Sequence, residues 1–345
     1  MKLIPTCQQP GSLNHEPVLR SDYPLVTVLV VCYNQAPYVE ECLESIKSQT
    51  YRNLEIIIVD DCSSDNSATV INDWLAREKV SAKLIVHSIN RGICPTFNEA
   101  LAQSNGKYIS ILAADDVYLA HKVETQVALF EALPATVGVI FSDAWQIGED
   151  GCLLPDKFIS SHRKFETIPE GRIFGALLEG NFIPATSTLI RRSCYQTIGV
   201  YDELLVYEDY DMWLRISREY DFAFSPIIST KYRVRRDSFT RTLLQVGCAG
   251  VESDFRIFEK CLKAKQPTVA EREIIKRRLK ALAFEIYARK CRRRRFYLLK
   301  LLLHVPGKYS LVMMLFTFLG VPGRYFNLLL KRRSPRVTLP VADEG

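Results

Sequence analysis

The stretch LEIIIVDDCSSDNS (residues 54–67) decides the fold that we expect for this chain. Its unbroken apolar run, Ile56–Val59, is typical of a strand buried on both faces of a parallel sheet. The run ends in two carboxylates, Asp60 and Asp61, which are followed by a turn rich in Ser, Asp and Asn. Because ligands of open α/β sheets bind just beyond the carboxyl ends of the strands, we predict a nucleotide pocket at this point.

Similar apolar runs recur on either side of this stretch. We predict further strands at Leu25–Cys32, Tyr108–Leu112 and Val137–Ser142, with amphipathic helices between the strands. Strands that alternate with helices of this length indicate βαβ units. The sequence therefore predicts an α/β fold in which a mostly parallel sheet is flanked by helices. Beyond about residue 250 the strand signals end, and basic helices are expected instead.

Charge is divided unevenly along the 345 residues. Residues 252–345 carry 22 Lys and Arg against 8 Asp and Glu, whereas the remaining residues carry 23 against 31. An acidic body joined to a basic tail suggests two separate tasks. We expect a flexible N-terminal arm (1–24), a catalytic domain (25–245) and a basic helical C-terminal extension (246–345) that associates with a membrane.

The cysteines and the N-terminus bear on the compartment. The ten cysteines form no CxxC pair, so we expect reduced thiols that act as small core residues. The first twenty residues are polar and lack the apolar core of a signal peptide. We therefore expect a protein on the cytoplasmic side, peripheral at the inner face of the cell membrane.

Three acidic pairs stand at the ends of predicted elements: Asp60–Asp61, Asp115–Asp116 and Glu208–Asp209. Mg²⁺ and Mn²⁺ prefer oxygen ligands, usually one or two carboxylates together with substrate phosphates. Another carboxylate can act as a general base toward an attacking hydroxyl. A single pair is better explained as a helix cap or a solvated turn, but three such pairs favour a site. GxGxxG and P-loop motifs are absent from the sequence, which disfavours nicotinamide dehydrogenases and P-loop NTPases.

The run VTVLVVCYNQAPYVEECLESIKSQTYRNLEIIIVDDCSSDNS (residues 26–67) resembles the opening of family 2 glycosyltransferases, which share the GT-A fold. The likeness continues through four further motifs: NRG (90–92), GKYI (106–109), AADD (113–116) and EDYDMWLR (208–215). It covers about residues 25–240, and order, spacing and residue type all agree. The resemblance implies a GT-A-type sheet and the inverting transfer of a sugar from a nucleotide diphosphate.

Carried over position by position, the resemblance implies a donor site. Seven residues would contact the nucleotide sugar: Tyr33, Asn34, Asp60, Asp61, Asn98, Asp115 and Arg235. Tyr33 would stack on or flank a uracil-type base, which Asp61 would bind with Asp60 close by. Arg235 stands where relatives often have His and would grip the diphosphate, with a surface ion pair as the alternative.

The resemblance also implies roles for the other two acidic pairs. Asp116, together with Asp115, would coordinate the Mn²⁺ or Mg²⁺ ion that bridges the diphosphate. Asp209, assisted by Glu208, would deprotonate the acceptor hydroxyl. Many relatives carry an acidic residue at the position of Ala113, and we interpret this difference as variation within the family.

The C-terminal extension has no Asp or Glu between Glu285 and Asp343. Basic clusters flank two apolar segments, Phe296–Leu303 and Tyr309–Pro322, and the second is too short to span a bilayer as a helix. This pattern favours helices that lie on an anionic membrane surface. A helical lid packed on the catalytic domain is the alternative. No nucleic-acid partner is expected, because no motif for one accompanies the arginines.

Together these features predict an inverting glycosyltransferase of cell-surface glycan assembly. It would move a sugar from a nucleotide-diphosphate donor, expected to be UDP-linked, to a hydroxyl of a lipid-linked or polysaccharide acceptor. A catalytically inactive scaffold or regulator that binds nucleotide sugars is the alternative, and only Ala113 supports it. A glycoside hydrolase with two carboxylates is a further alternative, which the uridine-type pocket at Asp61 opposes.

Overall fold

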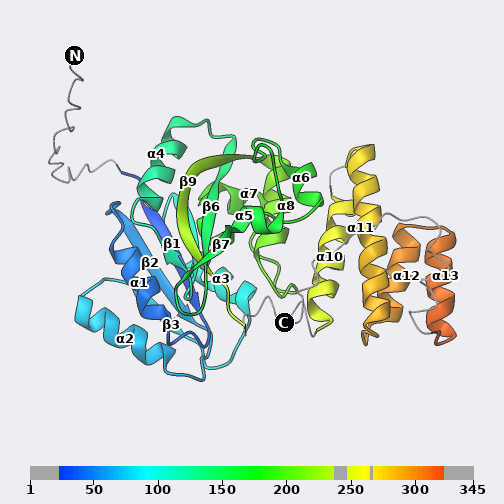
Figure 1. Cartoon of the computed structure of the whole chain (residues 1–345), viewed down its shortest axis with the longest axis horizontal. Coiled ribbons are helices and arrows are strands. Elements are labelled where there is room, and N and C mark those ends of the chain that lie inside the picture. The colour runs from blue at the N-terminus through cyan, green and yellow to red at the C-terminus, as the bar shows by residue number, and fades with distance from the viewer. Residues whose placement is uncertain (1–22, 237–246, 265–266, 322–345) are drawn as a thin grey trace, which may run out of the picture.

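The computed structural model describes residues 23–236, 247–264 and 267–321. Strands alternate with helices as far as β9, and the chain is helical beyond it (Figure 1). The expected N-terminal arm lies almost wholly outside the described residues, and so does the expected boundary between residues 245 and 246. Both therefore stay predictions.

The first half of the sheet is a run of parallel strands with helices between them. Its elements are β1 (Val26–Cys32), α1 (Val39–Lys47), β2 (Leu54–Asp60), α2 (Ser67–Glu78), β3 (Lys83–Val86), α3 (Ile93–Ala102) and β4 (Tyr108–Ala113). β1 pairs in parallel with both β2 and β4, and β2 pairs in parallel with β3. Cys32 lies opposite Asp60, and Val31 lies opposite Ala113. The carboxyl ends of these strands therefore meet at one edge.

The second half of the sheet is mixed. Its elements are β5 (Val117–Tyr118), α4 (Lys122–Ala132), β6 (Val137–Ile147), β7 (Leu153–Lys157), α5 (Phe158–His162), α6 (Phe174–Leu178), the 3₁₀ helix η1 (Ala185–Ser187), β8 (Leu189–Arg191), α7 (Arg192–Ile198), α8 (Asp209–Glu219) and β9 (Asp221–Arg233). The strand order is β3-β2-β1-β4-β8-β6-β9-β5, with β7 paired to β6. The predicted α/β fold is confirmed. The sheet is not parallel throughout, because the short β8 runs antiparallel to both β4 and β6.

The side chains of β1 divide between two apolar cores. Val28 and Val30 pack among residues of α1 and α2 on one face, whereas Leu29 and Val31 pack among residues of α3 and α8 on the other. Successive side chains of a strand point to opposite faces, so a fully buried strand needs cover on both. All seven residues of β1 are buried, as its apolar sequence predicts.

The C-terminal helices stand side by side beyond the sheet (Figure 1). They are α10 (Ala249–Lys263), α11 (Val269–Ala288), α12 (Arg294–His304) and α13 (Lys308–Phe318). Phe258 of α10 contacts Tyr210 of α8 edge to face, with ring centroids 6.1 Å apart. The apolar cluster around these rings continues from the part of the chain that contains the sheet (residues 23–236) into α13, where it includes Met313. The expected helical extension is confirmed, and its core is continuous with that of the part that contains the sheet.

One expectation about the cysteines is wrong. Cys248 and Cys291 form a disulfide rather than two thiols. Cys248 precedes α10 and Cys291 follows α11, and these helices pack against each other in opposite directions, so the two cysteines meet although 43 residues separate them. The free cysteines among the described residues are mostly buried, as expected of small core side chains.

A search of the described residues for membrane-spanning segments finds no helix with the required length and apolar character. This agrees with the expectation that the segment beginning at Tyr309 is too short to span a bilayer. α13 has only 11 residues, whereas a helix that crosses a bilayer needs about 20.

Candidate active site

The loops that follow β1 and β2 are joined by hydrogen bonds. The backbone N–H of Asn34 donates to Ser63 Oγ (2.9 Å), and the N–H of Ser64 donates to Asn34 Oδ1 (2.7 Å). Asn34 has a φ of 53°, a left-handed conformation that Asn tolerates better than most residues. The Asn34 side chain therefore holds the two loops together. A direct contact between Asn34 and a nucleotide-sugar donor stays a prediction. The ring of Tyr33 beside it is 47% exposed and accessible to a ligand.

Asp60 and Asp61 are both buried but have different partners. Asp60 accepts hydrogen bonds from the N–H (2.9 Å) and the Oγ (2.6 Å) of Ser63, so it stabilises its own turn. Asp61 accepts the N–H groups of Arg91 and Gly92, both at 2.8 Å. Asp61 therefore fixes the segment after β3 against the end of β2.

His87 is a site residue that the sequence analysis missed. Its Nδ1 lies 2.7 Å from Asp61 Oδ1, and its Nε2 lies 3.1 Å from Glu99 Oε2. His87 immediately follows β3, the third strand of the parallel group, and its backbone N–H bonds the carbonyl of Asp60. Ligands of α/β sheets bind beyond the carboxyl ends of the strands, and this holds for β3 as well as for β2 and β4. His87 could therefore have been predicted from the sequence.

Asn98 lies on α3 with both ends of its amide engaged. Its Nδ2 donates to the carbonyl of Tyr201 (3.0 Å) and to Glu203 Oε1 (2.9 Å), and its Oδ1 accepts the N–H of Tyr201 (2.9 Å). These bonds join α3 to the loop that leads to α8. In the structure the Asn98 side chain connects two parts of the fold. A contact between Asn98 and the nucleotide-sugar donor stays a prediction.

Asp115 and Asp116 lie just after β4, against the end of β9. Arg235 Nη1 lies 3.3 Å from Asp115 Oδ2, and the N–H of Arg233 donates to Asp116 Oδ1 (2.8 Å). Burial raises the pKa of Asp115, and the positive charge of Arg235 opposes that rise. Burial and the adjacent Asp115 raise the pKa of Asp116 well above its usual value. A cation beside this pair would stabilise both ionised carboxylates.

This pair fits a divalent cation in the number and type of its ligands. Within the described parts of the chain no three His, Cys, Asp or Glu residues cluster as a metal site would require. Mg²⁺ and Mn²⁺ sites commonly use one or two carboxylates and take their other oxygens from phosphates and water. The Gln35 side chain also approaches Asp115, and its buried Oε1 has no hydrogen-bond partner among the described residues. Asp115 and Asp116 would hold such an ion.

Glu208 and Asp209 stand at the start of α8. Asn181 Nδ2 donates to Asp209 Oδ2 at 2.8 Å, and the N–H of Tyr210 donates to Asp209 Oδ1 at 2.6 Å. Burial raises the pKa of Asp209 against these two bonds. Burial and the charge of Asp209 raise the pKa of Glu208 to about 8. Carboxylates with raised pKa values are suited to accept a proton near neutral pH.

Two chains of contacts connect the three acidic pairs. The backbone N–H of Gly92 bonds Asp61, and Cys94 follows two residues later in the first turn of α3. Burial, and after it the negative charge of Glu208, raise the pKa of the Cys94 thiol, so this turn lies within reach of the charge of Glu208. On the other side of the site, Asn181 bonds Asp209, and Thr186, a few residues further on, lies near enough to Asp116 to lower the pKa of that carboxyl, although its hydroxyl has no hydrogen-bond partner among the described residues. These contacts link the ends of β2 and β4 to the start of α8, and the assembly of the three pairs into one site stays a prediction.

The match to a known family agrees with this arrangement. The model of "Glycosyl transferase family 2" matches residues 27–199, which is half of the chain. This chain belongs to glycosyltransferase family 2. The matched range contains β1 to β4 with both of their acidic pairs, and α8 follows it. The resemblance stated from the motifs is confirmed.

Two relatives illustrate how far the similarity of this family 2 chain extends. An uncharacterized glycosyltransferase of Rickettsia bellii is 29% identical over 65% of this chain and 32% of its own length. A putative teichuronic acid biosynthesis glycosyltransferase of Bacillus subtilis, TuaG, is 29% identical over 49% of this chain and 63% of its own length. The chain thus spans less than two thirds of either relative.

Solved structures share the fold. S. aureus TarS 1–349 in complex with UDP-GlcNAc superimposes with a TM-score of 0.62 and 17% identity, covering 88% of this chain and 92% of that one. The mannosyltransferase PcManGT of Pyrobaculum calidifontis, in complex with GDP-Man and Mn²⁺, gives a TM-score of 0.53 and 16% identity, covering 94% and 92%. The expected glycosyltransferase fold is confirmed.

Proposed function

We propose that this chain catalyses the inverting transfer of a sugar from a nucleotide-diphosphate donor to an acceptor hydroxyl, with Asp209 as the general base. The observation that carries the proposal is the environment of Asp209. It is a partly buried carboxylate with a raised pKa, and Asn181, which bonds it, lies a few residues before Thr186, a neighbour of Asp116. A base and a diphosphate-binding pair around one sheet edge are what a displacement at an anomeric carbon requires.

The proposed reaction is a single displacement. Asp209 takes the proton of the acceptor hydroxyl while its oxygen forms a bond to the anomeric carbon. The bond from that carbon to the diphosphate oxygen breaks, and its electron pair leaves with the nucleoside diphosphate. Because attack and departure occur on opposite faces, the anomeric configuration inverts. When bound at Asp115 and Asp116, a Mn²⁺ or Mg²⁺ ion would neutralise charge on the leaving diphosphate.

We propose UDP as the nucleotide of the donor, with Tyr33 beside the base and Asp61 as the carboxylate that binds it. Asp61 retains acceptor capacity, since an ionised carboxylate offers about four lone-pair sites and fewer are occupied here. Arg235, beside Asp115, is placed to add a positive charge near the diphosphate. The TarS 1–349 complex contains UDP-GlcNAc, and the PcManGT complex contains GDP-Man and Mn²⁺.

For the acceptor we propose a lipid-linked saccharide or a polysaccharide of the cell surface, reached from the inner face of the membrane. Support comes from exposed apolar side chains on α12 and α13, the last two helices of the described residues. α12 exposes Phe296, Leu299 and Leu303, and α13 exposes Leu311, Leu315 and Phe318. Each set recurs every three or four residues and so forms a stripe along one side of its helix.

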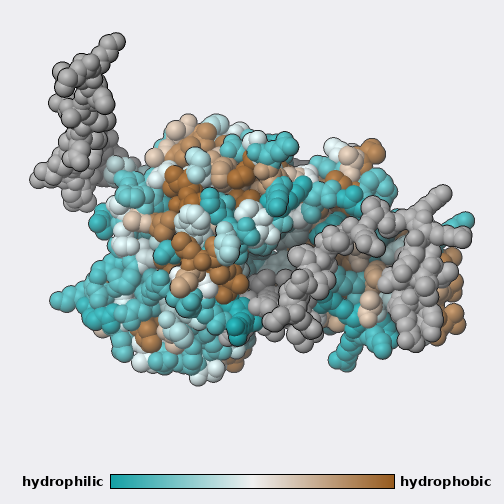
Figure 2. Space-filling view, viewed as in Figure 1, coloured by the Kyte–Doolittle hydropathy of each residue, from teal (hydrophilic) through white to brown (hydrophobic). Residues whose placement is uncertain are grey.

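The two stripes belong to neighbouring helices at the far end of the molecule. The Arg295 guanidinium lies 5.5 Å from the centre of the Phe318 ring, which holds the start of α12 near the end of α13. Figure 2 shows apolar residues over α13 at that edge. Apolar stripes within a segment that lacks acidic residues favour contact with an anionic lipid surface.

A donor panel tests the proposed reaction. Purified protein with Mn²⁺ is incubated with UDP-, GDP- and dTDP-sugars and candidate saccharide acceptors, and released nucleotide is measured. The anomeric configuration of the product is then determined by NMR. We expect turnover with a UDP-sugar and inversion. Retained configuration would contradict the mechanism, and nucleotide binding without turnover on any donor would favour the inactive scaffold.

Vesicle flotation tests the membrane proposal. We expect the full chain to float with vesicles rich in phosphatidylglycerol and Leu303→Asp to float less. Leu153→Asp is the matched control, because Leu153 is similarly exposed (61%, against 70% for Leu303) but lies on β7 in the catalytic half. Equal flotation of the two variants would count against contact through α12.

A further inference from the structure

The loop that leads to the catalytic pair is held by α10 of the C-terminal extension. This loop, which we name the base loop, comprises residues 199–208 between α7 and α8. The Ser253 hydroxyl accepts the backbone N–H of Val206 at 3.3 Å, and the hydroxyl of Tyr207 donates to Asp254 Oδ1. Tyr207 directly precedes Glu208, so α10 holds the base loop immediately before the two carboxylates.

A second attachment reaches the first turn of α8. Lys260 Nζ, two turns further along α10, lies 2.5 Å from Asp211 Oδ1 and 2.8 Å from Asp202 Oδ2. Asp202 belongs to the base loop, and Asp211 lies two residues after Asp209 in α8. One ammonium group therefore connects the beginning of the base loop to the helix turn that carries the proposed base.

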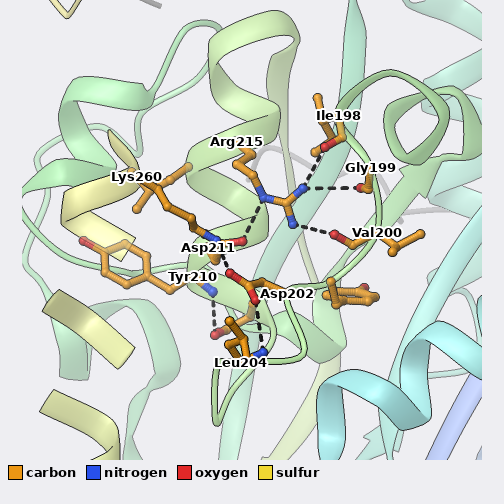
Figure 3. A network of polar contacts seen from close by, with 12 residues as sticks. Ile198, Gly199, Val200, Asp202, Leu204, Tyr210, Asp211, Arg215 and Lys260 are labelled. Atoms are coloured by element: carbon orange, nitrogen blue, oxygen red, sulfur yellow. Dashed lines mark hydrogen bonds and ion pairs between the residues drawn. The ribbon is translucent and has the colours of Figure 1, made fainter. Parts of the chain in front are cut away.

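Asp211 is held from two directions. Its Oδ2 accepts Arg215 Nε at 2.8 Å, while Lys260 occupies Oδ1. Arg215 also donates to the carbonyls of Ile198 (2.9 Å) and Val200 (2.8 Å), where the base loop begins. Figure 3 shows the Lys260 and Arg215 side chains converging on Asp211. Asp211 is 2% exposed, so it cannot exchange a lost cation for water as a surface carboxylate would.

We propose that Lys260 and Tyr207 are positioning residues for the general base. The proposal rests on the proposed role of Asp209. Lys260 acts through Asp211, and Tyr207 acts through Asp254; together they fix the start of α8 and the residue before Glu208. Neither residue touches donor or acceptor in this role. The helical extension is accordingly part of the catalytic apparatus.

The physical basis is the precision that proton transfer requires. A general base must lie within hydrogen-bond distance of the acceptor hydroxyl, and a displacement of about 1 Å can cost about 100-fold in rate. Without Lys260, Asp211 would keep Arg215 but lose the cation that links it to Asp202 and α10. Among the described residues, no hydrogen bond or ion pair joins α10 to Asp115 or Asp116. The first turn of α8 could then shift while Asp115 and Asp116 stay in place.

The first experiment compares Lys260→Met with a control on the same helix. We expect Lys260→Met to lower kcat at least about tenfold, with the KM for the nucleotide sugar within about twofold of wild type. Lys260→Arg keeps the charge and should restore most of kcat. Lys263→Met is the matched control, because Lys263 is bonded to Glu259 within α10. A kcat for Lys260→Met equal to that of Lys263→Met would overturn the proposal.

The second experiment uses non-additivity to separate positioning from general destabilisation. If Lys260 acts through Asp209, adding Lys260→Met to Asp209→Asn should leave the residual kcat unchanged. A further loss equal to that in the wild-type background would show a merely structural role. Tyr207→Phe removes only the hydroxyl bonded to Asp254, so it provides a variant that keeps the packing if Lys260→Met folds poorly. We expect it to lower kcat without changing KM for the donor, and an unchanged kcat would count against the role of Tyr207.

These outcomes distinguish the inference from the proposed function. If Asp209→Asn transfers sugar at the wild-type rate, the role of Asp209 as base fails and the inference fails with it. If Asp209→Asn is inactive while Lys260→Met and Tyr207→Phe behave like Lys263→Met, only the positioning inference fails.

Discussion

The two sides of the sheet edge hold their carboxylates in opposite ways. At the end of β2, Asp61 accepts two backbone N–H groups and contacts His87, although it is only 3% exposed. At the start of α8, Glu208 has no side-chain hydrogen bond to another described residue, and burial raises its pKa to about 8. The same chemical group thus has three partners at the end of β2 and is sparsely bonded at the start of α8.

In the proposed function, this difference separates binding from chemistry. Hydrogen bonds to a carboxylate stabilise its ionised form and fix its direction, which suits a group that recognises a nucleotide. Asp209, the proposed base beside Glu208, accepts two hydrogen bonds, but burial still raises its pKa, and a raised proton affinity suits a group that must accept a proton. Four predictions test this comparison, from the largest expected effect to the smallest.

Asp209→Asn should lower kcat on the order of 10²–10⁴-fold while the affinity for UDP stays within about twofold. The amide keeps the shape of the side chain but cannot accept the proton of the acceptor hydroxyl. Steady-state transfer assays and calorimetric titration with UDP measure the two quantities. A parallel loss of UDP affinity would mean that Asp209 belongs to the nucleotide side, and the comparison would be wrong.

Asp61→Asn should weaken UDP binding roughly 10- to 100-fold, with a smaller effect on kcat. Each hydrogen bond to a charged group contributes about 1.5–3 kcal/mol, and an amide cannot accept from donors on both sides. Asp60→Asn is the control, because the Asp60 carboxylate accepts the N–H and the hydroxyl of Ser63 in its own turn rather than the N–H groups after β3. Calorimetric titration measures the UDP affinity of both variants. An equal loss of affinity in the two would show that the hydrogen bonds from Asp61 to the segment after β3 are not what makes Asp61 important for UDP binding.

Glu208→Gln should flatten the dependence of stability on pH. The pKa of Glu208 rises from 4.5 to about 8 on folding, so between these pH values the folded state binds a proton that the unfolded state has lost. The free energy of unfolding of the wild type should therefore fall as pH rises from 4.5 to 8, with part of this fall due to Glu208. Urea unfolding at several pH values measures the slopes. Identical slopes for variant and wild type would refute a raised pKa at this residue.

Glu259→Gln should cost about 1 kcal/mol of stability at neutral pH and have little effect on catalysis. Burial disfavours ionised Glu259, but hydrogen bonds from Lys263, Lys300 and His304 outweigh burial and lower its pKa to about 2. This contribution is present above pH 4.5 and is lost as pH falls toward 2. The free energy of unfolding is measured by denaturation at pH 7 and at pH 3. The difference between variant and wild type should be larger at pH 7. An equal separation at both pH values would contradict the lowered pKa.

The sequence alone identified the parallel half of the sheet and the three acidic pairs. These features are local: an apolar run such as Ile56–Val59 and the carboxylates that follow it are contiguous in the chain, and parallel pairing brings such ends together. The motif around Asp209 was likewise readable, because the base and its helix are one continuous segment. The roles of these residues in donor binding and catalysis stay predictions.

Only the tertiary structure showed which residues far apart in the chain form hydrogen bonds and ion pairs with each other. Tyr207 and Asp254 are 47 residues apart, Lys260 and Asp202 are 58 apart, and no local pattern pairs them. Asn98 illustrates the same limit, since its motif suggested the donor while its amide bonds Tyr201, 103 residues away. Hydrogen bonds and ion pairs depend on positions within a few tenths of an ångström, and only the packing of α3, α8 and α10 sets those positions.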